Sequence, residues 1–188
     1  MIAVKIKDKY KNLSRDELLD KAYELGFGFE KYSTSCCQSV VAAMHEMLEI
    51  EDSMVRASNS SAGGQVATTV GTCGGLIGGT MVLDYFFGRT PEEMVYTDEK
   101  EPMTETLFEA FEVAKQLYDR YFKEYGTIIC PQIQVQLYGR HYYLLDEDEV
   151  EKFEAIGAHS DPNKSCCRIV GNAARWTLEI LLNKTGIL

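Results

Sequence analysis

Six cysteines are the residues of this sequence best suited to redox or metal chemistry: Cys36, Cys37, Cys73, Cys130, Cys166 and Cys167. Ser-Cys-Cys occurs twice, at residues 35–37 and 165–167, and Thr-Cys occurs at 72–73, each time directly before an apolar segment that predicts a helix. Free N–H groups and the helix dipole stabilise a thiolate at such a position. These sites therefore suit metal ligands or reactive thiols, with six small buried hydrophobic residues as the alternative interpretation.

The spacing of the cysteines excludes several familiar motifs. No Cys-x-x-Cys is present, so neither a zinc ribbon nor a thioredoxin-like site is indicated. His45, His141 and His159 are isolated, and each is expected to have a surface or core role rather than to bind a metal. No carboxylate pair and no Ser/His/Asp arrangement stands out, so hydrolytic chemistry is not indicated.

The elements that must position the cysteines are predicted to be helices. A capping box at residues 14–17 begins a helix that extends to about Phe29, and further helices are expected at 36–49, from 52 or 53, at about 146–157 and from 165. Thr90-Pro91 is another start signal. Cys130 is expected in an extended segment that leads into a short turn or helix. Apolar residues in alternating steps of four and three predict an amphipathic helix whose stripe faces the core: Leu107, Phe111, Ala114, Tyr118, Tyr121 and Tyr125.

The segment from residue 71 to about 87 is rich in glycine and apolar residues and predicts a buried helix. Glycine costs up to about 1 kcal/mol relative to alanine in a helix, so several glycines in one helix require a reason. Gly74, Gly75 and Gly78 leave a bare strip along which another backbone or an inorganic group can approach closely. Close helix–helix packing alone is the alternative.

Taken together, the patterns predict an all-α protein with a single domain over residues 1–188 and about six or seven helices. The formal charge of −10 repels phosphate backbones, so nucleic acid is not an expected partner. The first nine residues contain no apolar run typical of a signal peptide, and the weakly polar run at 70–83 is too short to span a bilayer. We therefore expect a cytoplasmic protein that does not span a membrane.

The motifs resemble those of the C_GCAxxG_C_C family of redox-active proteins, named for four separated cysteines around a CGAxxG motif. Residues 73–78 (Cys-Gly-Gly-Leu-Ile-Gly) match this motif, with Gly75 in place of the family's alanine. The segments at 36–40, 130–133 and 166–170 resemble the surroundings of the other three cysteines, and the resemblance covers about residues 36–182.

The resemblance implies which cysteines carry the chemistry. It indicates Cys36, Cys73, Cys130 and Cys166, with Cys37 and Cys167 as secondary or alternate ligands. The family is also similar to the N-terminal part of split-Soret cytochromes, in which such cysteines are associated with an iron–sulfur centre. This sequence lacks the haem-binding cysteines of those proteins.

The expected function is electron transfer or redox sensing by an iron–sulfur cluster or another metal centre held by four thiolates. Two alternatives remain at this point: a metal-free thiol/disulfide redox protein, and a non-catalytic module with a structural zinc ion or an adaptor role. The resemblance further implies a protein partner, either an electron-transfer protein or one associated with a transporter. The sequence is also compatible with a homo-oligomer.

Overall fold

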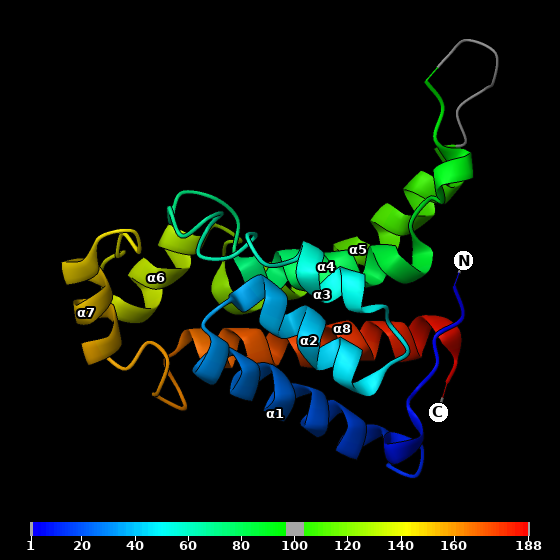
Figure 1. Cartoon of the computed structure of the whole chain (residues 1–188), viewed down its shortest axis with the longest axis horizontal. Helices are drawn as coiled ribbons and strands as arrows, with labels where there is room; N and C mark the ends of the chain where they lie inside the picture. Colours follow the sequence, from blue (N-terminus) through cyan, green and yellow to red (C-terminus); the bar gives the residue numbers. More distant parts are fainter. Residues whose placement is uncertain (1, 97–103, 188) are drawn as a thin grey trace.

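Helices form all the regular structure of residues 2–96 and 104–187, which are the residues that the computed structural model describes (Figure 1). Within these residues there are eight α-helices and two 3-10 helices, and the only strand-like pairings are isolated bridges between Ile6 and Leu48 and between Thr72 and Ile129. The α-helices are α1 (Arg15–Ser33), α2 (Cys36–Met47), α3 (Asp52–Ala57), α4 (Gly74–Phe87), α5 (Thr104–Tyr125), α6 (Cys130–Tyr138), α7 (Glu147–Ala155) and α8 (Cys166–Thr185), and the 3-10 helices are η1 (Asp8–Tyr10) and η2 (Pro91–Glu93). The all-α prediction is confirmed, whereas the predicted number of helices was too low.

Two segments differ from the predicted helices, in opposite directions. The segment that starts at Cys130 forms a full helix, α6, although its apolar and polar residues alternate over 132–137. Conversely, the start signal at Thr90 leads only to the single turn η2. Within residues 2–96 and 104–187, no helix combines the length and the apolar composition that crossing a bilayer requires.

Local capping and tertiary packing together determine where helix α1 begins and ends. Its capping box is present, because the Ser14 N–H donates to Glu17 Oε2 at 2.8 Å and the Glu17 N–H donates to Ser14 Oγ at 3.4 Å. The helix continues past the predicted end at Phe29, and Gly26 lies inside it. A Cβ atom at Gly26 would lie 2.8 Å from Ala174 Cβ, so this glycine allows α1 and α8 to approach closely rather than ending the helix.

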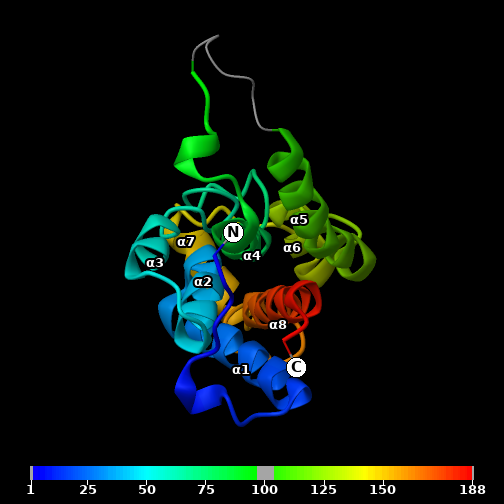
Figure 2. The ribbon, with the colours of Figure 1, turned by 90° about the vertical axis from the view of Figure 1, so that its right-hand side faces the viewer.

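Helix α8 lies at the centre of the bundle and packs against α1, α2, α4 and α5 (Figure 2). Most of its apolar residues are fully buried in the main core. Helices α6 and α7 lie together at one end of the bundle, next to the N-terminal ends of α2 and α8 (Figure 1). A second, smaller core of Tyr142, Phe153 and Ala158 forms there.

The stripe on α5 is only partly in the core. Tyr121 and Tyr125 are buried as predicted, but Phe111 is 56% exposed and Tyr118 is 38% exposed, so the prediction was wrong for these two residues. The helix carries apolar residues on two faces and the bundle covers one of them. Its N-terminal end also projects away from the other helices (Figure 1).

Candidate functional site

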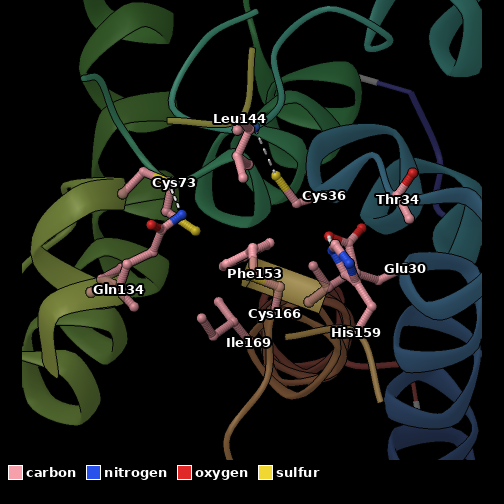
Figure 3. A pocket seen from close by; sticks show the side chains of 14 residues that line it. Glu30, Thr34, Cys36, Cys73, Gln134, Leu144, Phe153, His159, Cys166 and Ile169 are labelled. Atoms are coloured by element: carbon pink, nitrogen blue, oxygen red, sulfur yellow. Dashed lines mark hydrogen bonds and ion pairs between the residues drawn. The ribbon is translucent and has the colours of Figure 1, made fainter. Parts of the chain in front are cut away.

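Four cysteines from four different helices line one pocket at the end of the bundle (Figure 3). Cys36, Cys130 and Cys166 are the first residues of α2, α6 and α8, and Cys73 directly precedes α4. The pocket encloses a cavity of about 60 Å³. The structure therefore brings together the four cysteines that the resemblance indicated, although they are far apart in the sequence.

The walls of this cysteine pocket are mainly apolar. The apolar side chains come from α6, α7, α8 and the segment before α7: Ile133, Leu144, Phe153, Ile169 and Val170. The remaining lining residues are polar or glycine: Glu30, Thr34, Gly63, Gln134 and His159. An apolar surrounding keeps water out and strengthens every electrostatic interaction inside the pocket.

The second cysteine of each adjacent pair does not line this pocket. Cys37 is fully buried, and its sulfur lies 3.8 Å from Met81 Sδ. Cys167 is also fully buried, and its thiol donates to the backbone oxygen of His159 at 3.4 Å. Since consecutive helical residues point about 100° apart, only one member of each pair can face the pocket.

The glycines of α4 allow a close approach to this helix. The atoms that approach belong mostly to other parts of the protein, namely α2 and α5. A Cβ atom at Gly74 would collide with the Cys36 sulfur, and one at Gly78 would collide with the backbone of Cys37, so α4 and α2 meet along this strip. A Cβ atom at Gly75 would lie 2.6 Å from the Tyr121 hydroxyl.

Several hydrogen-bond donors point at the sulfur atoms of the pocket. The Gly63 N–H donates to Cys36 Sγ at 3.4 Å, and the Gln134 amide donates to Cys130 Sγ at 3.8 Å. The Tyr121 hydroxyl lies 3.9 Å from Cys73 Sγ, and the N–H groups at the start of α4 also face this sulfur. Donors of this kind stabilise negative charge on sulfur.

The loop that carries Gly63 is strained. Five consecutive residues, 63–67, have positive φ angles, and three of them are not glycine: Gln65, Val66 and Ala67. The left-handed conformation costs roughly 1–2 kcal/mol for each such residue. Strained backbone of this kind persists where the surrounding structure holds it, typically at functional sites.

Glu30 and His159 form a buried polar pair at one side of the pocket (Figure 3). Glu30 is only 2% exposed, accepts a hydrogen bond from Ser39 Oγ at 3.1 Å and has Oε1 3.7 Å from His159 Nε2. The other ring nitrogen of His159 lies 2.5 Å from Glu154 Oε1. Burial opposes protonation of His159, but its contacts with the Glu30 and Glu154 carboxylates outweigh this and raise its pKa.

No local sequence pattern pointed to this pair. Glu30 lies in the last turn of α1 among other polar residues, and only tertiary packing buries it. His159 was expected to have a surface or core role, and the structure places it in the lining of the cysteine pocket with a hydrogen bond to Glu154.

Burial dominates the acid–base properties of the thiols. It raises the pKa of Cys130 to about 12 and is also the largest cause of the raised pKa values of Cys36, Cys73 and Cys166. The negative charge of Glu30 is the next cause for Cys36 and Cys166. Burial therefore opposes the thiolate form that the helix N-termini favour, and a bound cation would offset this loss of hydration.

The two cysteines outside the pocket give a testable pH dependence. Burial raises the pKa of Cys37 and of Cys167 from 9.0 to about 12, so the folded protein keeps these protons where the unfolded chain releases them. The free energy of unfolding of the reduced, metal-free protein should therefore fall as pH rises from about 9 toward 12, by up to about 1.4 kcal/mol per pH unit for each thiol.

Urea unfolding at pH 8.5 and pH 10.5 measures this loss of stability. A double variant, Cys37→Ala with Cys167→Ala, removes both groups and should lose clearly less stability between the two pH values than the wild type. Equal losses in the two proteins would contradict the assignment of the effect to these thiols.

The pocket cysteines are not arranged as ligands of a single metal ion. Among residues 2–96 and 104–187, no three Cys, His, Asp or Glu side chains lie close enough together to bind one metal ion. A tetrahedral zinc site needs its sulfur ligands about 2.3 Å from a common centre. The four pocket cysteines thus line a cavity but do not converge on a single metal-ion position.

Comparison with known proteins agrees with the cysteine pattern. No curated protein and no solved structure matches the chain. The model of the family described as "Putative redox-active protein (C_GCAxxG_C_C)" matches residues 34–180, which is more than half of the chain and includes all four pocket cysteines. The chain therefore belongs to the C_GCAxxG_C_C family of redox-active proteins.

Proposed function

We propose that Cys36, Cys73, Cys130 and Cys166 bind an iron–sulfur cluster and that the protein serves in electron transfer or redox sensing. The observation that carries this proposal is that one thiol from each of four helix N-termini lines a single apolar pocket. Four thiolates are the usual ligand set of such clusters, which exchange single electrons when bound.

The electrostatic surroundings fit a negatively charged group. Four helix N-termini contribute partial positive charge, and the donors from Gly63, Gln134 and the start of α4 face the sulfurs. Burial raises the pKa of the Cys36 and Cys166 thiols, so the metal-free pocket keeps these protons and a bound cation would displace them.

The structure gives less support to the two alternatives. A metal-free thiol redox protein needs reactive thiolates, and the pocket thiols have raised pKa values. A structural zinc ion needs its ligands to converge on one point, whereas these sulfurs surround a cavity. An iron–sulfur cluster would be held by Cys36, Cys73, Cys130 and Cys166 together, which all line the one cavity.

The partner of this centre is expected to be a protein, either an electron carrier or a protein associated with a transporter. This part of the proposal rests on the redox character of the family. Exchange of electrons with a partner requires contact near the pocket, which lies at the α6–α7 end of the bundle.

Anaerobic purification or reconstitution, followed by measurement of iron and acid-labile sulfide, tests the proposal. We expect both elements in stoichiometric amounts, together with a visible absorption band that bleaches on reduction. Stoichiometric zinc without colour would favour the structural alternative. Absence of both iron and sulfide from protein that has never been exposed to air would contradict the proposal of a cluster.

A further inference from the structure

Tyr138, at the end of α6, has a buried hydroxyl without a partner. Among the described residues, its oxygen is the buried side-chain polar atom that makes no hydrogen bond. Its ring packs edge-on against Phe153 with centroids 5.7 Å apart, and Cys166 packs against the same small core. Such unpaired hydroxyls are rare in proteins because each loses its hydration without compensation.

Tyr121, on α5, presents a second buried hydroxyl to a pocket cysteine, Cys73. The side chain is fully buried, and its oxygen lies 3.9 Å from Cys73 Sγ. The absence of a side chain at Gly75 leaves room for this hydroxyl, since a Cβ atom there would lie 2.6 Å from it. Edge-to-face packing against Trp176, at 5.7 Å between centroids, holds the ring in place.

A neutral thiol and a thiolate differ greatly as partners for these hydroxyls. A protonated sulfur is a weak acceptor, which agrees with the long contact at Tyr121 and the unpaired oxygen at Tyr138. A negatively charged sulfur is a strong acceptor, and hydrogen bonds to ionised groups are roughly twice as strong as those between neutral groups.

We propose that the hydroxyls of Tyr121 and Tyr138 donate hydrogen bonds to the sulfurs of Cys73 and Cys166 when these sulfurs carry negative charge. Both tyrosines are then positioning residues that stabilise the more negative, reduced state of the centre and raise its reduction potential. This inference rests on the proposed cluster. It adds two aromatic donors, from α5 and α6, to the backbone donors of the pocket.

Tyrosine-to-phenylalanine variants remove only the hydroxyl groups. In the cluster-loaded protein, Tyr121→Phe and Tyr138→Phe should each lower the equilibrium constant for one-electron reduction by about tenfold, which corresponds to about 59 mV toward more negative potential. In the metal-free protein, Tyr138→Phe should instead raise the thermal unfolding midpoint by about 2–4 °C, because the unpaired hydroxyl is gone.

Each variant has a matched control in its own aromatic cluster. Tyr125 lies next to Tyr121, at 5.3 Å between ring centroids, but its hydroxyl accepts a hydrogen bond from Asn172 at 3.0 Å. Tyr142 lies next to Tyr138, at 6.3 Å between ring centroids, and its ring packs against the Arg140 guanidinium at 4.4 Å. Tyr125→Phe and Tyr142→Phe should leave the potential unchanged.

The possible failures are distinguishable. If the wild-type protein holds no iron, the proposed function fails and this inference fails with it. If all variants load iron normally and the potentials of Tyr121→Phe and Tyr138→Phe equal that of the wild type, the hydroxyls do not act on the sulfurs, while the cluster proposal stands. Equal shifts in the control variants would likewise overturn the inference.

Discussion

Replacing Cys36 by alanine is expected to remove nearly all iron and sulfide from the anaerobically prepared protein, whereas replacing Cys37 leaves both in place. The Cys36 sulfur lines the pocket and accepts the Gly63 N–H, while the Cys37 sulfur lies against Met81. Loss of groups that only orient metal ligands already costs about 10–100-fold in affinity, so loss of a ligand should cost at least that much. Iron and sulfide analysis of the two variants measures the difference.

The second Cys-Cys pair provides an independent repeat of this comparison. Cys166→Ala should behave like Cys36→Ala, and Cys167→Ala should retain the cluster, because Cys167 donates to the backbone of His159 instead of facing the pocket. Far-ultraviolet circular dichroism of all four variants checks that the helices remain. Retention of iron in Cys36→Ala together with its loss in Cys37→Ala would show that the ligands have been assigned to the wrong member of each pair.

Replacing Gly78 by alanine should destabilise the protein by about 1–3 kcal/mol, although alanine is the better helix former. The new Cβ atom would collide with the backbone of Cys37 and would lie 3.1 Å from Val40 Cβ, and a backbone cannot move aside as a flexible side chain can. Helices α2 and α4 would have to separate at the point where both carry pocket cysteines. Urea unfolding of the metal-free protein measures the loss.

Gly28 is the matched control for this prediction. It also lies inside a helix, but a Cβ atom there would meet no other atom within 4 Å. Gly28→Ala should therefore be neutral or should stabilise the protein by up to about 1 kcal/mol. If Gly78→Ala proves as stable as Gly28→Ala, the approach of α2 to α4 is looser than described.

Sequence patterns were most informative where local chemistry decides the structure. The capping box at Ser14 fixed the start of α1, and the serines before both Cys-Cys pairs mark the starts of α2 and α8. Local patterns also predicted that cysteines would stand at helix N-termini. The choice of Cys36 and Cys166 over their neighbours came from helical phase and from the family register.

Features that depend on tertiary packing were not predictable in this way. Periodicity shows that α5 has apolar residues but not which of its two faces the bundle covers, so Phe111 and Tyr118 were misassigned. The burial of Glu30 and the raised pKa of Cys130 have the same origin, because both depend on what other helices place around them. The unpaired hydroxyl of Tyr138 also becomes visible only when α6 is packed against α7 and α8.

The origin of the pocket cysteines in four helices has a consequence for protein engineering. A metal site formed by a short Cys-x-x-Cys loop can be grafted onto a new scaffold as one peptide. Here a designer would have to transplant the relative placement of four helix starts, together with the strained loop that carries Gly63. The transferable unit is therefore the end of a helical bundle, and a sequence search for a compact motif is a poor guide to it.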